Sequence, residues 1–134
     1  MSDTYMTIRE MCDAFEVTPR TLRFYEAKEL LFPVRQGTKR LFTRSDRARL
    51  KLILRGKRFG FSLEDIRQIL DLYDPAQQNT GQMQRALELG RERLEAMRRQ
   101  RDELTLAIDD LAQQLEWGGK MMTSLEAAAN KAAE

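Results

Sequence analysis

The sequence predicts a mainly α-helical protein in which a small winged helix-turn-helix domain precedes one long dimerising helix. Three observations support this prediction. Helix-start motifs recur through the first 75 residues, a Gly-containing turn separates two apolar segments near residues 30–43, and apolar residues recur in steps of four and three from Met83 to Leu115. Capping motifs mark helix starts, a glycine turn joins short strands, and a heptad pattern is typical of a coiled coil.

Composition excludes several classes of protein. The 134 residues contain no His and one Cys, so a single chain lacks the ligands of soft-metal sites and the usual nucleophile–base pairs. No run of eighteen apolar residues and no signal-peptide pattern is present. We therefore expect a cytoplasmic protein with no metal site, no cofactor and no enzymatic activity.

The positive charge is concentrated in one region. The net charge is only +2, but residues 35–58 hold ten basic residues and a single acid, Asp46. A local basic patch attracts a polyanion even when the whole chain is nearly neutral. This distribution favours nucleic acid as a partner.

Two short helices are predicted at the N-terminus. Thr7 and Glu10 form a capping box, and an apolar face follows at helical spacing: Ile8, Met11, Cys12 and Phe15. In that position Cys12 reads as a small buried hydrophobe rather than a sensor thiol. A tight turn at Glu16-Val17 leads to the second helix, which together with the first makes a helix-turn-helix.

The second helix has the features of a DNA-recognition helix. Thr18 suits the N-cap and Pro19 the first helical position. Arg20 and Thr21 fall in the first turn, where an inserted helix meets base edges in the major groove. Arg23 and Tyr25 can reach phosphates, while Leu22 and Tyr25 can also pack inward.

A basic β-hairpin is predicted next. Residues 30–34 and 41–43 are apolar and flank residues 35–40, which contain Gly37. Such a pattern predicts two short strands, with Arg35, Lys39 and Arg40 at the tip of a wing. The alternative is a solvated loop.

Two more helices complete the first domain. Thr43 and Asp46 form a second capping box, and that helix is expected to stop near Gly60. A further helix starts at Ser62, with a third capping box to Asp65, and ends at Asp74-Pro75. Cations recur along one face of the first of these helices: Arg44, Arg47, Lys51, Arg55 and Arg58. Part of this stripe is expected to contact phosphates, although a solvated face is the alternative.

A heptad seam organises the remainder. We expect a winged domain at 5–75, a connector at 76–82, a coiled-coil helix at 83–117 and a short tail at 118–134 that packs or frays. A 35-residue helix spans roughly 50 Å, too long to bury its stripe on the first domain, so a homodimer is favoured. Gly90 and Arg101 interrupt the seam; its other members are Met83, Leu87, Leu94, Met97, Leu104, Ile108, Leu111 and Leu115.

The helix is expected to break at Gly118-Gly119. Trp117, directly before that break, and Met121 and Met122, just past it, are apolar and are the candidate lining of an effector pocket, with plain packing as the alternative. The fifteen residues from Lys120 onward are too few for an independent ligand-binding domain.

Taken together, residues 18–26, the Arg40-Leu41-Phe42 sequence, Asp46, the Lys57–Leu63 segment and the dimerising helix resemble the MerR family of bacterial transcription regulators over residues 5–117. The resemblance implies an antiparallel coiled coil in the dimer and binding to a two-fold promoter operator. It also implies DNA distortion that lets RNA polymerase engage both promoter elements.

By position, the resemblance implies that Arg20 and Thr21 lie near DNA bases. It also implies that a larger set of residues contacts the DNA or positions the residues that do. That candidate DNA-binding set is Thr18, Arg20, Thr21, Arg23, Tyr25, Lys39, Arg40, Lys57 and Arg58. The family commonly has Gly-Tyr in the wing where this chain has Thr38-Lys39.

The resemblance also bears on the effector. Metal-sensing members carry Cys residues at and after the dimerisation helix, and this chain has none there, so a small non-metal effector is expected. Residues 47–58 are similar to members that control branched-chain amino acid and acyl-CoA breakdown. A coiled-coil scaffold protein with an incidental basic patch and an architectural DNA binder without an effector are the alternative readings.

Overall fold

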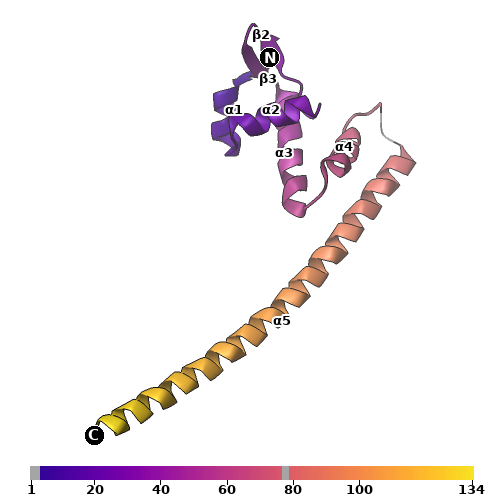
Figure 1. The fold of residues 1–134 in the computed structure, drawn as a ribbon. Coiled ribbons are helices and arrows are strands. Elements are labelled where there is room, and N and C mark those ends of the chain that lie inside the picture. The colour runs from indigo at the N-terminus through magenta and orange to yellow at the C-terminus, as the bar shows by residue number, and fades with distance from the viewer. Residues whose placement is uncertain (1–3, 77–78) are drawn as a thin grey trace. The chain divides into compact units, whose positions relative to one another are not determined.

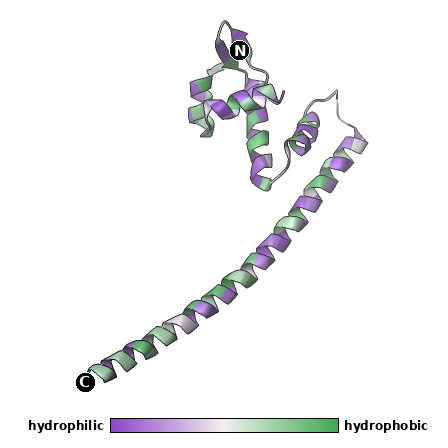
Figure 2. Ribbon diagram, viewed as in Figure 1, coloured by the Kyte–Doolittle hydropathy of each residue, from purple (hydrophilic) through white to green (hydrophobic). Residues whose placement is uncertain are grey.

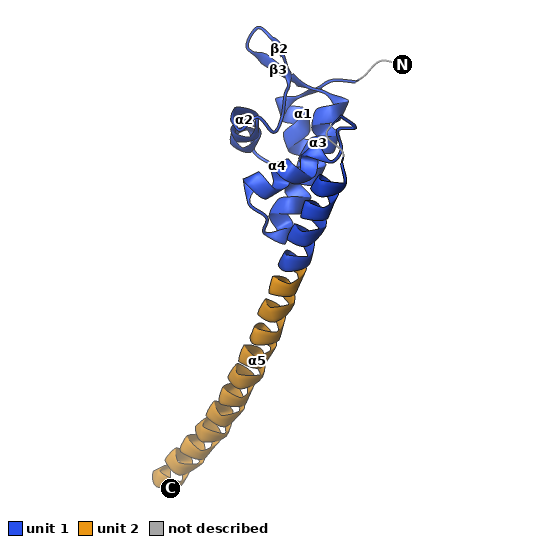
Figure 3. Cartoon of the chain, turned by 90° about the vertical axis from the view of Figure 1, so that its right-hand side faces the viewer, with its two compact units in different colours: residues 1–93 blue, residues 94–134 orange. Residues whose placement is uncertain are grey.

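The computed structural model describes residues 4–76 and 79–134 and divides into two units, Met1–Arg93 and Leu94–Glu134 (Figure 3). Three short strands and five helices follow one another along the described chain (Figure 1). They are β1 (Met6–Thr7), α1 (Ile8–Phe15), α2 (Pro19–Ala27), β2 (Val34–Gln36), β3 (Lys39–Phe42), α3 (Arg44–Phe59), α4 (Leu63–Asp71) and α5 (Thr80–Ala133).

Side-chain caps start α1 to α4, as the sequence predicts. The hydroxyls of Thr7, Thr18, Thr43 and Ser62 each accept a hydrogen bond from the backbone N–H three residues later, at 3.1–3.2 Å. Glu10 and Asp46 return a bond to the N-cap backbone, which completes two of the three predicted capping boxes. At the start of α4, the Ser62 hydroxyl caps the helix, but the predicted return bond from Asp65 is not among the described contacts. Since these motifs are local, they fix the helix starts independently of the rest of the fold.

The wing is part of a three-stranded antiparallel sheet of order β1-β3-β2. Gly37 and Thr38 alone separate β2 from β3, and Gly37 has φ 60°, which a two-residue hairpin turn of this kind requires. The hairpin prediction is confirmed, but the tip is shorter than expected. Arg35, Lys39 and Arg40 lie in the strands and not at the tip.

The first strand, β1, has no counterpart in the sequence-based prediction. Met6 pairs with Phe42 and Thr7 with Leu41. A two-residue strand carries no detectable alternation, so only its pairing partner reveals it.

One hydrophobic core joins α1 to α4 with the sheet. Its members come from α1, α2, β3, α3, α4 and the segment that follows α2, and they are almost wholly shielded from solvent. They are Met11, Leu22, Tyr25, Leu30, Leu31, Phe42, Leu50, Ile53, Ile66 and Leu70. Because α2 contributes Leu22 and Tyr25 to this core, its opposite face is turned outward.

Gly56 marks the close approach of α3 to α4. A Cβ on Gly56 would lie 2.8 Å from Cγ1 of Ile66, a side chain that is 2% exposed. Glycine to alanine in a helix interior ordinarily stabilises a protein by about 1 kcal/mol. Here we expect Gly56→Ala to destabilise it instead, by about 1–3 kcal/mol, because the packed Ile66 must move.

Urea unfolding at fixed protein concentration measures this effect. Gly119→Ala is the matched control, since Gly119 is also helical and a Cβ there meets nothing within 4 Å. That variant is expected to gain stability. Equal gains in both variants would contradict the packing account.

The long helix α5 differs at both ends from the prediction. It begins at Thr80 rather than near Met83, and it continues through Gly118-Gly119 to Ala133. The predicted break was therefore wrong: two glycines cost roughly 2 kcal/mol, and the strong helix formers on both sides propagate the helix across them. Residues 77–78 of the predicted connector lie outside the described residues.

The predicted seam of α5 is exposed in the single chain. Hydrophobic residues recur along the helix between hydrophilic ones (Figure 2). All seven predicted interface residues are solvent-exposed: Leu87, Leu94, Met97, Leu104, Ile108, Leu111 and Leu115. Among residues 4–76 and 79–134, no helix has the length and hydropathy needed to cross a bilayer.

Candidate nucleic-acid interface

The recognition helix α2 presents its first turn to solvent. Arg20 and Arg23 are exposed, and Thr21 is half-buried. The Thr18 hydroxyl holds this turn: it accepts from the Thr21 N–H at 3.2 Å and lies 3.0 Å from the Thr21 hydroxyl. Thr18 thus starts the helix, and within the described part of the chain neither Arg20 nor Arg23 makes a hydrogen bond or an ion pair with a carboxylate.

Two arginines from neighbouring helices anchor the other end of α2. Arg67 of α4 donates to the carbonyls of Lys28 and Glu29, and Arg49 of α3 donates to the carbonyl of Leu30 at 2.7 Å. Carbonyls at a helix C-terminus lack partners within the helix, and cations suit the negative end of its dipole. Sequence reasoning missed both residues, because the contacts span 19 to 39 positions.

Three of the predicted DNA-binding cations converge beside the wing. An open pocket of about 330 Å³ is lined by Arg23 of α2 and by Lys39 and Arg40 of β3. Thr7 and Ile8, at the start of α1, line the same pocket together with Thr38. Three cations around one hollow favour an anion such as a phosphate group of DNA.

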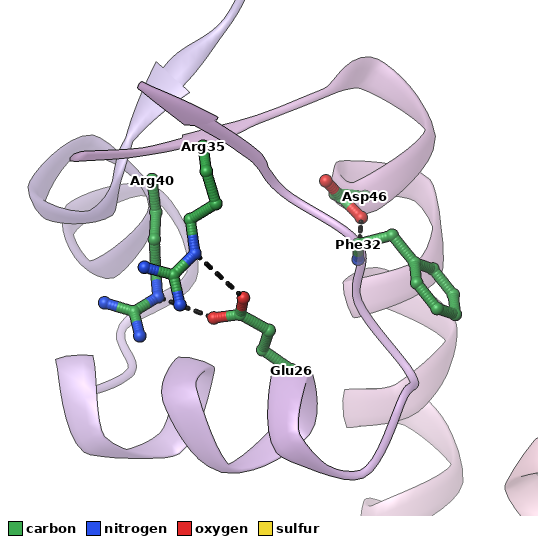
Figure 4. Close-up of polar contacts among 5 residues, drawn as sticks. All are labelled: Glu26, Phe32, Arg35, Arg40 and Asp46. Atoms are coloured by element: carbon green, nitrogen blue, oxygen red, sulfur yellow. Dashed lines mark hydrogen bonds and ion pairs between the residues drawn. The ribbon is translucent and has the colours of Figure 1, made fainter. Parts of the chain in front are cut away.

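A carboxylate that the sequence-based prediction omitted links the wing to α2. Glu26 accepts from Nε of Arg40 at 2.5 Å and from Nε of Arg35 at 3.3 Å (Figure 4). An acid in the last turn of a helix, close to a predicted basic wing, is the sequence signal that could have identified it.

A buried carboxylate fixes the segment that enters the wing. Asp46 is 1% exposed, and one of its oxygens accepts from the Phe32 N–H at 2.8 Å (Figure 4). The other oxygen accepts from the Thr43 N–H at 3.1 Å. The only acid within the basic segment 35–58 is therefore structural.

Tyr25 is placed differently from the exposed cations. Tyr25 is 5% exposed and lies in the core, which leaves little of its side chain accessible for the predicted phosphate contact. Burial raises the pKa of the Tyr25 hydroxyl, which therefore stays protonated at neutral pH. Cys12 is half-buried, and burial, then Asp13, raise its thiol pKa, in keeping with a packing role.

The stripe on α3 forms a second cationic group. Arg44, Lys51, Arg55 and Arg58 are exposed, but Arg47 donates to the carbonyl of Thr4 at 2.7 Å. Lys57 and Arg58 lie in the last turn, about 20 Å along the helix from Thr43, so they are not brought together with the wing pocket.

Comparisons with known proteins agree with this arrangement. Residues 6–73 match the family model described as MerR HTH family regulatory protein, and residues 47–114 match the model described as MerR, DNA binding. The transcriptional regulator ZntR of Escherichia coli K12 is 45% identical over 67 residues, covering 48% of each chain. The chain spans about half the length of the first curated relatives it matches.

Two solved structures resemble most of this chain. A MerR-family transcriptional regulator from Bacillus cereus matches with a TM-score of 0.64 and 29% identity over 84% of each chain. HiNmlR, a MerR-family regulator lacking the sensor domain and bound to promoter DNA, matches with a TM-score of 0.62 and 25% identity, over 79% of this chain and 80% of that one. Since each family model matches half of the sequence, the chain belongs to the MerR family of helix-turn-helix, DNA-binding transcription regulators.

Proposed function

We propose that this regulator binds a two-fold promoter operator as a homodimer and reads its sequence through the first turn of α2. The observation that carries the proposal is the pocket lined by Arg23, Lys39 and Arg40, together with the exposed Arg20, which lies three residues before Arg23 in α2. DNA phosphates bound at the pocket would fix the position of α2 along the duplex. Arg20 would then contact a base edge in the major groove.

The dimer is proposed to form through the seam of α5, as an antiparallel coiled coil. Leu104 and Leu111 are each 61% exposed in the single chain, and apolar stripes of this length are stable when they pack against another helix. A two-fold dimer carries two identical winged domains and so matches a palindromic operator.

We further propose that binding distorts the operator so that RNA polymerase can use a promoter with widely spaced elements. Bending a site of this size costs on the order of a few kcal/mol. Phosphate contacts from the wing pocket and from exposed residues of α3, such as Lys57 and Arg58, are the groups that would offset that cost.

The effector is proposed to be a small non-metal molecule, and the protein to work in the cytoplasm without catalytic activity. The sequence has no His and a single, half-buried Cys12, which is a poor donor set for a soft metal. A thermal-shift screen should therefore respond to acyl-CoA thioesters or small amphipaths. A higher melting temperature with Zn²⁺ and with none of the organic compounds would contradict the proposed non-metal effector.

Two alanine variants test how the DNA is recognised. Arg23→Ala should weaken binding to every DNA fragment and reduce the salt dependence by about one ion per half-site. Arg20→Ala should instead relax sequence preference, by about 1–3 kcal/mol at the base it reads. Gel shifts with the protein's own upstream region and with unrelated DNA, at two salt concentrations, measure both effects.

Arg99→Ala, which removes an exposed cation from α5, is the matched control and should leave both properties unchanged. If Arg20→Ala leaves the preference for the upstream DNA over unrelated DNA unchanged, Arg20 does not read a base. A wild-type dimer that gives no gel shift would favour the scaffold alternative.

A further inference from the structure

The wing and the recognition helix are joined by a single carboxylate. Glu26, in the last turn of α2, contacts Nε of both Arg40 and Arg35, which lie on the two strands of the hairpin (Figure 4). We propose that Glu26 is a positioning residue for DNA recognition: it holds the wing's arginines in register with α2 and so determines specificity through geometry. This inference rests on the DNA-binding role proposed above.

Two features of its surroundings disfavour the negative charge of Glu26. A carboxylate in the last turn of a helix opposes the helix dipole, and α2 has no basic residue in that turn. Glu26 also lies next to cations that would face a polyanion, where a negative charge repels the ligand. Its two arginine contacts are what compensate for these costs.

The two arginines in turn need a bridge. Arg35 and Arg40 are directly opposite each other in the antiparallel register of β2 and β3. Like charges in that relation repel and favour separation of the side chains. Glu26 gives both guanidinium groups one shared acceptor, and its side chain is only 21% exposed, which strengthens the attraction.

The mode of contact leaves Arg40 able to bind DNA. Within the described residues, Glu26 engages Nε of Arg40 and no contact involves its terminal nitrogens. Those two nitrogens are donors suited to a phosphate, and Arg40 lines the pocket with Arg23 and Lys39. Glu26 thus orients a phosphate-binding group without occupying its donors.

A purely electrostatic role predicts the opposite outcome, which makes the proposal testable. If Glu26 only repels DNA, neutralising it strengthens binding to all DNA alike. If it positions the wing, removing it weakens the operator complex relative to unrelated DNA. Glu26→Ala removes both arginine contacts, whereas Glu26→Gln keeps the length and one acceptor.

The experiment compares full-length wild type, Glu26→Ala, Glu26→Gln and the control Glu29→Gln. Glu29 lies just beyond the end of α2, three residues after Glu26. Its carboxylate contacts no wing residue within the described part of the chain. Fluorescence anisotropy gives the dissociation constant for the protein's upstream region and for an unrelated duplex of equal length. Thermal unfolding shows whether each variant is folded.

We expect Glu26→Ala to lower the ratio of specific to unrelated binding by roughly ten-fold or more, with unrelated binding unchanged or tighter. Glu26→Gln should fall between it and wild type, and Glu29→Gln should keep the wild-type ratio. If Glu26→Ala does not fold, the reduced ratio of Glu26→Gln carries the test.

Equal strengthening on both duplexes, or an unchanged ratio, would overturn the positioning role while leaving the proposed function intact. A wild-type protein with no preference for its upstream region would overturn both.

Discussion

Leu104→Glu is expected to convert the proposed homodimer to a monomer and to weaken binding to a two-half-site operator by roughly 10²–10⁴-fold. Leu104 lies in the middle of the predicted seam and is 61% exposed in the single chain. A glutamate there would bring uncompensated charge into the contact between helices. Each winged domain would then bind alone and lose the effective concentration that linkage provides.

Sedimentation velocity and gel shifts on the same samples measure both effects. The matched control is Leu106→Glu, because Leu106 is on the same helix and 71% exposed but lies off the seam. This variant should remain dimeric with wild-type affinity. Dissociation of the Leu106 variant with a stable Leu104 variant would show that α5 pairs through a different face.

Asp46→Ala is expected to destabilise the winged domain strongly, by about 3 kcal/mol. The variant leaves the N–H groups of Phe32 and Thr43 without their acceptor. Each buried donor without a partner costs about 1–3 kcal/mol. Because the Phe32 bond holds the segment that enters β2, the wing should also lose its fixed position.

Urea unfolding at fixed protein concentration tests this expectation, since dimerisation makes stability concentration-dependent. Asp65→Ala is the control: Asp65 occupies the same position after the N-cap of α4 but is half-buried, and its contribution is mainly to the helix dipole. It should lose at most about 1 kcal/mol. Similar losses of stability in both variants would mean that Asp46 contributes no more than an ordinary helix-capping residue.

The sequence predicted local structure well because its signals are local. The bonds of Thr7 with Glu10 and of Thr43 with Asp46 span three residues, so the pattern of the chain contains them completely. The hairpin followed from Gly37 in the same way. The continuation of α5 past Gly118-Gly119 was not predicted, because it depends on the summed helix propensities of the flanking turns.

The candidate site was predicted in its composition but not in its connections. Arg23, Lys39 and Arg40 were identified from charge and position, and they line one pocket. The carboxylate of Glu26, which bridges the wing, and the second role of Asp46 at Phe32 depend on contacts across 9 to 14 positions. Such contacts are set by tertiary packing, which no local pattern reveals.

The central claim is that two chains joined through α5 bind one promoter duplex. Multi-angle light scattering of the complex with the protein's upstream region tests it most directly. We expect a complex that contains two 15.7 kDa chains per duplex, and a free protein with the mass of two chains. A single chain on the duplex, or a free monomer at concentrations that saturate the DNA, would contradict it.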